Sequence, residues 1–355
     1  MEEKIKRLKK WSEGDPQPPI GIELAPTLRC NLNCKFCWRR KKSFDKKDSE
    51  LRSKELSVEK YFEIIEEAAE LGVQEIKVIG GGESLFREET FEILKKIKKE
   101  NLRGYICTNG VLFNDGEIEK LIDLGWDHVK FSLHGLKKTH NELVEREVFE
   151  RVLENISSFQ NSSTTVEIGM VVVKDNYKEI ENMLDLSKEL GVDYLFLEPI
   201  TVYSDLGERL ALSKEEKDEL KQDLNDLIEK VKKYEIETNF SEFMENNFAE
   251  KTNNMREFIM SDVSDKDSFA EIPCYEPFLR MGIRVDGRVA PCGFYDEERG
   301  DSVRNKSLKE VWYGDYFRER RDEQYDKTLP SYCSKCCTSL VKNQMSLRNK
   351  LREIL

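Results

Sequence analysis

The 355-residue sequence lacks any apolar run long enough to cross a lipid bilayer, which takes about 20 residues in a helix. Its first residues are mostly charged, so the apolar core of a secretory signal is also missing. We therefore expect a cytoplasmic protein with no membrane partner. A surplus of positive charge is absent as well, because 70 acidic residues and 58 basic ones give a net charge of −12. Phosphate backbones are bound by clustered cations, so nucleic acid is not an expected partner.

Cysteine is present in an uneven pattern. The chain has nine cysteines, and without an export signal they are not expected to form disulfides. Clustered cysteines in a reducing compartment indicate metal or redox centres. Two clusters and three isolated residues occur: Cys30, Cys34 and Cys37; Cys333, Cys336 and Cys337; and Cys107, Cys274 and Cys292.

Between residues 21 and 200, short apolar segments alternate with longer amphipathic ones. One helix is predicted over Val58–Leu71, because Ser57 suits its N-cap and Gly72 its end. The alternation predicts a parallel sheet with helices on its outer face, and the low charge of most strands predicts that both faces are covered. Periodicity leaves open whether the sheet curls into a partial barrel or is doubly wound. The strands are expected at Ile22–Ala25, Glu75–Ile79, Gly104–Cys107, His128–Leu133, Thr165–Val173 and Tyr194–Leu197.

The whole chain is expected to divide into five segments. The region after the last of these strands is strongly charged and helical, with no clear strand. Farther on, Asp286-Gly287 indicates a hairpin, and Ser307–Arg320 is predicted to be one amphipathic helix. The segments are an N-terminal extension (1–20), a barrel (21–205), a bridging segment (206–270), a small cysteine-bearing domain (271–340) and a basic helical tail (341–355).

The first cysteine cluster has the spacing C-x3-C-x2-C and follows the first expected strand directly. Three thiolates, from Cys30, Cys34 and Cys37, can hold three irons of a [4Fe–4S] cube and leave the fourth iron without a protein ligand. Such an open metal position is where a substrate or cosubstrate binds. A structural zinc loop is the alternative, but none of the three histidines in the chain is near this loop to supply a fourth ligand.

This loop resembles that of the radical S-adenosylmethionine (SAM) superfamily, with Phe36 as the aromatic residue before the third cysteine, and the resemblance covers residues 20–200. It implies a partial (β/α)6 TIM-like barrel, a SAM-binding [4Fe–4S] cluster and SAM itself. In the family the open iron binds the amino and carboxylate groups of SAM. Reductive cleavage then gives methionine and a 5′-deoxyadenosyl radical, which removes a hydrogen atom from the substrate.

Further motifs support this resemblance. Three glycines and Glu83 follow the second expected strand, and glycine allows close approach between backbone and ligand. The family's Gly-Gly-Glu-Pro segment binds the SAM amine, and here Ser84 replaces the proline. The resemblance therefore implies a SAM pocket formed by Phe36, Gly80, Gly81, Gly82, Glu83, Asn109, Ser132 and Val172.

Candidate catalytic residues lie at the carboxyl ends of strands, where barrel enzymes place their sites. Glu198, His134 and Tyr203 occupy such positions and are candidates for the base that takes a proton from a substrate radical. Glu198 equally suits a role as a backbone hydrogen-bond acceptor, and His134 equally suits the surface or a helix cap. Cys107 is expected in the core.

The remaining cysteines predict a second, closed site. Four thiolates, from Cys274, Cys292, Cys333 and Cys336, fit either zinc or a [4Fe–4S] cluster. The pattern resembles the auxiliary-cluster domain of many radical SAM enzymes. We expect its shorter, one-cluster form, called Twitch, rather than the seven-cysteine SPASM form. Cys337 is left over, either as an alternative ligand to Cys336 or as a small buried residue.

An auxiliary cluster favours a net two-electron oxidation, because it can take the electron that remains after hydrogen abstraction. We expect a radical SAM oxidoreductase that oxidises a polar small molecule, such as a sugar or cyclitol, with a flavodoxin- or ferredoxin-type electron donor. The alternative is a peptide substrate that receives a thioether or carbon–carbon crosslink. Peptide-modifying members often carry a leader-binding domain before the barrel. Only 29 residues precede Cys30, which favours the small molecule, although such a binding domain can also be a separate chain. A non-enzymatic electron carrier would leave the open cysteine loop unexplained.

Overall fold

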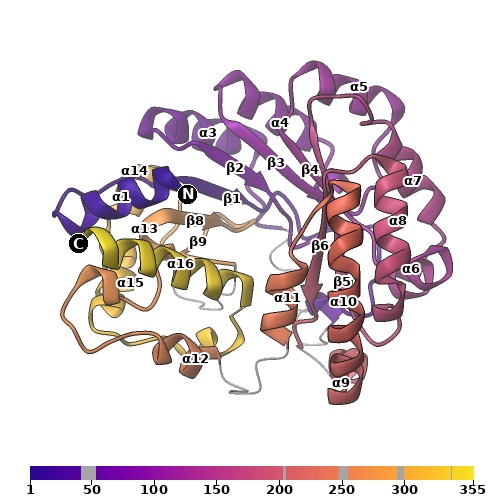
Figure 1. Cartoon of the computed structure of the whole chain (residues 1–355). Helices are drawn as coiled ribbons and strands as arrows, with labels where there is room; N and C mark the ends of the chain where they lie inside the picture. Colours follow the sequence, from indigo (N-terminus) through magenta and orange to yellow (C-terminus); the bar gives the residue numbers. More distant parts are fainter. Residues whose placement is uncertain (41–52, 203–204, 248–254, 294–299, 337) are drawn as a thin grey trace.

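The structure is a computed structural model that describes residues 1–40, 53–202, 205–247, 255–293, 300–336 and 338–355. Its centre is a nine-stranded sheet in the order β7-β6-β5-β4-β3-β2-β1-β8-β9. Neighbouring strands are parallel except β8 and β9. The sheet curves without closing, as in a partial TIM-like barrel (Figure 1). The strands are β1 Gly21–Leu24, β2 Glu75–Val78, β3 Arg103–Thr108, β4 His128–Ser132, β5 Thr165–Val172, β6 Tyr194–Pro199, β7 Glu237–Thr238, β8 Arg280–Ile283 and β9 Val289–Ala290.

Helices follow the first strands and pack on the convex side of the sheet (Figure 1). The first of them confirms the predicted bounds, because the Ser57 side chain accepts a hydrogen bond from the Lys60 amide and Gly72 ends the helix with φ of 81°. Its buried residues recur at helical spacing and join the main core. The helices of this part are α3 Val58–Leu71, α4 Thr90–Lys99, α5 Asp115–Asp123, α6 Lys137–Val144, α7 Phe149–Ser157 and α8 Ile180–Leu190.

The inner face of the sheet is polar and half-buried on several strands, whereas the low charge of the strands had predicted that both faces are covered. On β4, Val129 and Phe131 are fully buried in the core beneath the helices, whereas His128, Lys130 and Ser132 alternate with them and are half-buried on the other face. Strands β2 and β6 alternate in the same way. The β-branched and aromatic residues of the outer face dominate the composition of these strands and conceal the period of two.

The cysteine-bearing C-terminal region contributes two strands to the barrel sheet. Strand β8 pairs in parallel with β1, in the register Gly21 to Arg280, and β9 returns antiparallel to β8. The hairpin predicted around Asp286-Gly287 is confirmed, with Gly287 at φ of 83°. The pairing of β8 with β1 was not predicted, because strand pairing between distant segments leaves no local pattern in the sequence.

The bridging segment contains a short strand, contrary to expectation. Strand β7 pairs with the first two residues of β6 and adds one strand at this edge of the sheet. Two residues are too few to produce a recognisable period. The capping box at Ser213 and Glu216 begins the longest helix here. The helices of this segment are α9 Asp205–Leu210, α10 Lys214–Tyr234, α11 Phe240–Asn247 and α12 Met255–Ser261.

The predicted single helix over Ser307–Arg320 is wrong. Gly314 divides it into α14 Leu308–Trp312 and α15 Asp315–Tyr325, and Gly314 is the N-cap of α15. A Cβ atom on Gly314 would lie 2.5 Å from the Glu310 carbonyl oxygen, so this sharp turn suits only glycine.

Both ends of the chain are helical and pack together in a second core. This core joins α1 Glu2–Ser12, α13 Glu276–Leu279 and the predicted tail helix, α16 Thr338–Ile354, and the chain termini lie on one side of the molecule (Figure 1). Leu8, Phe278 and Leu347 are fully buried in it. Among the described helices, none combines the length and the apolar character needed to cross a membrane.

Candidate cluster and substrate site

The three cysteines of the first cluster lie on the loop that leaves the carboxyl end of β1. The Cys37 amide donates a hydrogen bond to the Cys34 carbonyl oxygen at 3.1 Å, and the Leu32 amide donates to Cys30 Sγ at 3.5 Å. All three thiols are half-buried. Burial raises the pKa of the Cys30 thiol, and the nearby charges of Glu83 and Cys37 raise it further. Three half-buried thiols on one loop fit a cluster that has three protein ligands.

The glycines after β2 make room for the start of this cysteine loop. A Cβ atom on Gly82 would lie 2.1 Å from the Arg29 carbonyl oxygen, and one on Gly81 would lie 2.4 Å from Leu28 Cδ2. The Glu83 amide also donates a hydrogen bond to the Arg29 carbonyl oxygen at 2.9 Å. The glycine segment therefore holds the cysteine loop by close backbone contact, in addition to any contact with SAM.

Glu83 is buried between the cysteine loop and β3. Its carboxylate accepts hydrogen bonds from Thr108 Oγ1 at 2.8 Å, the Asn109 amide at 2.6 Å and the Leu85 amide at 3.2 Å. Burial raises the pKa of Glu83, and these three bonds partly oppose that rise. An ionised carboxylate has roughly four acceptor positions, so one remains for a cation such as the SAM ammonium.

Asn109 binds the cysteine loop through its side chain. Its Nδ2 donates a hydrogen bond to Asn31 Oδ1 at 2.7 Å, and Arg146 donates to the Asn31 carbonyl oxygen at 2.8 Å. The Nδ2 group of Asn31 is buried and has no hydrogen-bond partner. A buried donor without an acceptor costs about 1–3 kcal/mol. An acceptor on a group bound at this loop would satisfy it, so the loop fits the expected cofactors.

His134 is buried rather than placed at the surface or at an open rim. The Val171 amide donates a hydrogen bond to its Nδ1 at 3.1 Å, and the Phe36 ring contacts it edge-on with centroids 4.7 Å apart. Burial lowers the pKa of His134 well below its usual value, and the neighbouring His140 adds to this effect. His134 is therefore neutral and joins β5 to the cysteine loop, which does not support its predicted role as a catalytic base.

The two valines at the end of β5 lie on opposite faces of the sheet. Val172 is buried in the core beneath the helices, whereas Val171 lies on the inner side and packs against the same small apolar cluster as Phe36. Ser132 is half-buried on the inner face, and Gly169 is its register partner on β5. The contact of Val172 with adenine stays a prediction, and the position of its neighbour Val171 depends on a strand register that the sequence does not reveal.

The inner face carries an ion-pair network that was not predicted. Glu198 pairs with Lys130, whose ammonium also lies 3.0 Å from Glu167 and 4.5 Å from the centroid of the Phe196 ring. Burial opposes a charge on Lys130, but the negative charge of Glu198 in particular outweighs it and raises the pKa of the amine well above its usual value. A Cβ atom on Gly169 would lie 2.3 Å from Lys130 Cε, so this glycine leaves room for the lysine.

Cys107 lies on the same inner face and not in the apolar core. Burial raises the pKa of its thiol to about 12, and the charges of Lys130, Glu198 and Glu83 also act on it. Cys107 is the register partner of Lys130 on the neighbouring strand, so it lies beside this ion-pair network. In the sequence, the polar residues at every second position of β4 were the signal that could have revealed this polar inner face. Tyr203, the third catalytic candidate, lies outside the described residues.

The second cysteine group lies in the C-terminal region. Burial raises the pKa of the Cys274 thiol well above its usual value, and the charges of Glu276, Cys292 and Cys333 add to the rise. The Cys336 amide donates a hydrogen bond to the Cys333 carbonyl oxygen at 3.2 Å. Cys337 lies outside the described residues. In the described part of the chain no three His, Cys, Asp or Glu side chains are spaced to hold a single metal ion. The four-cysteine ligand set thus stays a prediction.

Known proteins resemble this chain over the same regions. The family model of the radical SAM superfamily matches residues 24–187, and that of the iron–sulfur cluster-binding SPASM domain matches residues 274–337. A probable GTP 3′,8-cyclase from Methanothermobacter marburgensis is 33% identical over 180 residues, which is 49% of this chain and only 56% of that protein. PqqA peptide cyclase from Granulibacter bethesdensis is 23% identical over 331 residues, 90% of this chain and 80% of that one.

The fold also resembles that of solved structures. Streptococcus suis SuiB bound to its precursor peptide SuiA has a TM-score of 0.66 and 19% identity, over 95% of this chain and 73% of SuiB. The two family models identify iron–sulfur centres rather than zinc as the cofactors, whereas the cysteines that bind them and the one-cluster Twitch form stay predictions. The chain therefore belongs to the radical SAM superfamily, with a SPASM-type domain, and its cofactors are a SAM-binding [4Fe–4S] cluster, SAM and auxiliary iron–sulfur.

Proposed function

We propose that this enzyme oxidises a polar substrate whose hydroxyl or charged group binds to Lys130 and Glu198 inside the barrel. The observation that carries the proposal is the ion pair between these two residues on the inner face, where Cys107 is the register partner of Lys130. An apolar substrate would displace water from this ion pair and offer no hydrogen bond in return, whereas a polar substrate can form hydrogen bonds with both residues.

The cofactors supply, when bound, a SAM-derived radical that takes one hydrogen atom and an auxiliary cluster that takes one electron. One proton must leave the substrate as well for the product to be oxidised by two electrons. Glu198 is suited to accept that proton, because its side chain is 40% exposed at the end of β6. Lys130 stays protonated and donates a hydrogen bond to the substrate oxygen, which orients the C–H bond.

The residues that hold the cofactors are part of the proposal. Glu83, Asn109 and Ser132 would bind SAM, together with Phe36 and the glycine segment. A flavodoxin- or ferredoxin-type protein would supply the first electron in the cytoplasm. The cluster ligands would be Cys30, Cys34 and Cys37 for SAM and Cys274, Cys292, Cys333 and Cys336 for the auxiliary cluster.

The test uses anaerobically reconstituted enzyme with dithionite and SAM. The 5′-deoxyadenosine formed without substrate reports an intact SAM site. We expect a dialysable metabolite fraction to raise this rate and to yield a product that is lighter by two hydrogen atoms. Lys130→Met should keep the substrate-free rate and lose the stimulation by at least about tenfold, whereas Lys130→Arg should keep part of it. Equal stimulation of Lys130→Met and wild type would contradict the proposal.

A second candidate function is the modification of a ribosomally made peptide. Its support is the likeness to PqqA peptide cyclase, which extends over most of both chains. In the same assay a peptide fraction, and not the dialysable one, would then raise the formation of 5′-deoxyadenosine, and the product would be a crosslinked peptide.

A further inference from the structure

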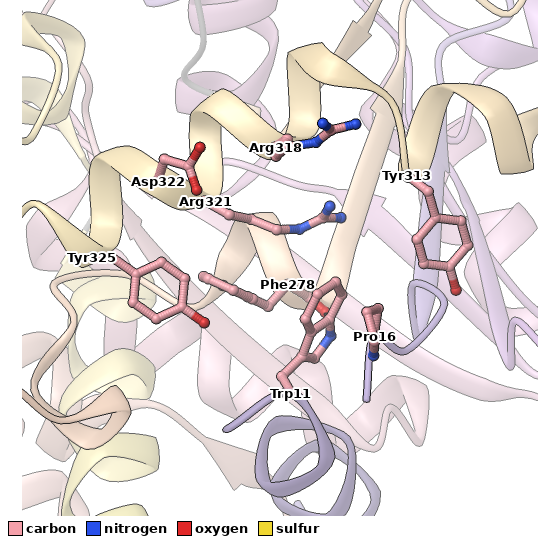
Figure 2. A pocket seen from close by; sticks show the side chains of 8 residues that line it. All are labelled: Trp11, Pro16, Phe278, Tyr313, Arg318, Arg321, Asp322 and Tyr325. Atoms are coloured by element: carbon pink, nitrogen blue, oxygen red, sulfur yellow. The ribbon is translucent and has the colours of Figure 1, made fainter. Parts of the chain in front are cut away.

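A recess of about 210 Å³ lies on the opposite side of the barrel from the cysteine loop. Trp11 of α1, Phe278 of α13 and Arg321 of α15 line it (Figure 2). Phe278 precedes β8, and Arg280 of β8 pairs with Gly21 at the start of β1. The recess is therefore at the amino edge of the strands, whereas the cysteine loop leaves their carboxyl edge, and neither family-defining cysteine group contributes to it.

Arg321 carries a buried positive charge, and no acidic side chain of the described residues forms an ion pair with it. It is 6% exposed, its Nε donates a hydrogen bond to the Pro277 carbonyl oxygen at 3.0 Å, and its Nη2 has no hydrogen-bond partner. Burial lowers the pKa of Arg321 to about 10, so the guanidinium is still charged at neutral pH.

Within the described ranges, the other buried arginines each pair with a carboxylate, which Arg321 does not. Arg7 lies 3.0 Å from Glu3, Arg87 lies 3.3 Å from Glu89, and Arg348 pairs with Asp262. Among the described residues, Arg321 is the buried arginine without a carboxylate within 4.0 Å. An unpaired buried charge costs several kcal/mol, about as much as the loss of one member of a buried ion pair.

Aromatic rings hold this guanidinium but do not neutralise it. Its Cζ lies 4.4 Å from the ring centroid of Trp312 and 4.6 Å from that of Trp11. Figure 2 shows the side chain extending from α15 toward Trp11 and Tyr313, into the space that the recess occupies. Ring contacts of this kind occupy the face of a guanidinium and leave its edge for a planar anion, which arginine binds with two parallel hydrogen bonds.

We propose that this recess binds a carboxylate carried on an aromatic group, with the carboxylate on Arg321 and the ring on Trp11 and Tyr325. Asp322 lines the same recess, and its negative charge favours a monoanion over a phosphate dianion. The ligand would connect the N-terminal helix to the C-terminal domain. This site is separate from the proposed substrate site and does not depend on it.

The experiment is calorimetric titration of the full-length, cluster-loaded protein with N-acetyl-L-phenylalanine. We expect saturable binding at millimolar concentration or below. The neutral N-acetyl-L-phenylalaninamide and inorganic phosphate should each bind at least about tenfold more weakly. Equal binding of the amide or of phosphate, or no binding of the acid, would overturn the proposal. These comparisons use the wild-type protein alone, so they remain valid if a variant fails to fold.

Two variants then locate the site. Arg321→Gln should weaken binding of the acid by at least about tenfold, because it removes the buried charge. The matched control is Arg318→Gln, which alters the same recess at a residue that is 63% exposed and paired with Asp315, and it should weaken binding by less than about threefold. A larger effect at Arg318 than at Arg321 would refute the assignment. A tripeptide ending in phenylalanine distinguishes the source of the ligand, since tighter binding than the free acid indicates a peptide carboxyl terminus and weaker binding a small metabolite.

Discussion

Single residues of this site are constrained by their immediate neighbours more than by their chemical type. Gly82 shows this, because it was predicted to bind SAM, yet the close approach of the Arg29 carbonyl oxygen already leaves no room for a side chain there. His134 shows it in the other direction, because a predicted base is buried with its Nδ1 accepting a backbone hydrogen bond. A substitution at Gly82 distinguishes a role in ligand binding from one in backbone packing, and a substitution at His134 distinguishes a catalytic base from a buried hydrogen-bond acceptor.

Gly82→Ala should destabilise the cysteine loop, because its Cβ would lie 2.1 Å from the Arg29 carbonyl oxygen. Overpacking of this kind costs about 1–3 kcal/mol. We expect less iron at the SAM-binding cluster and unchanged iron at the auxiliary site, measured by Mössbauer spectroscopy. Gly116→Ala is the control, since its nearest atom, Asn114 Oδ1, is 3.8 Å away. Full iron content in Gly82→Ala would show that the loop tolerates the added methyl group.

His134→Asn should keep substrate-stimulated activity and its pH profile between about pH 6 and 8. Burial holds the pKa of His134 well below its usual value, so the imidazole is neutral across this range and only acid would protonate it. The asparagine oxygen can accept the same hydrogen bond from Val171. A loss of about 10²–10⁴ in rate, with one limb of the pH profile removed, would instead identify His134 as a general base.

At the scale of elements, the last helix is held by buried polar contacts as well as by apolar ones. Arg348 of α16 is fully buried, pairs with Asp262, and donates hydrogen bonds to the carbonyl oxygens of Ile272 and Pro273 at 3.1 and 2.8 Å. Pro273 is the neighbour of Cys274, so the position of α16 affects the auxiliary cysteines.

Arg348→Met should destabilise the protein by about 3–5 kcal/mol, because it leaves the buried Ile272 and Pro273 carbonyl oxygens without this donor and Asp262 with only the more distant Arg352, at 3.7 Å. Urea unfolding followed by circular dichroism measures the change. Lys350→Met, at an exposed position of the same helix, should change the free energy of unfolding by less than about 0.5 kcal/mol. Similar values for the two variants would mean that the contacts of Arg348 contribute little.

At the scale of the whole molecule, the two cysteine groups belong to one continuous sheet. Strand β8 of the C-terminal region pairs directly with β1, from which the first cysteine loop departs. The loop after β1 and the hairpin that precedes Cys292 are therefore joined to the same sheet.

The number of clusters follows from iron analysis of the reconstituted enzyme. We expect about eight irons per chain in the wild type and about four in a Cys30→Ala/Cys34→Ala/Cys37→Ala variant, with the remaining iron as a [4Fe–4S] cluster. About four irons in the wild type, and none in the variant, would leave no auxiliary electron acceptor and would contradict the two-electron oxidation.

Local patterns of residues were enough to predict the alternation of strands and helices, the bounds of α3 and the spacing of the first cysteine loop. These features depend on contacts within a few residues, such as the caps at Ser57 and Gly72, and on local ligand spacing. Three other features became known only from the folded chain: which of Val171 and Val172 faces the interior of the barrel, the ion pair of Lys130 with Glu198, and the pairing of β8 with β1. Each of these depends on strand register and on pairing between segments far apart in the chain, which no local pattern of residues encodes.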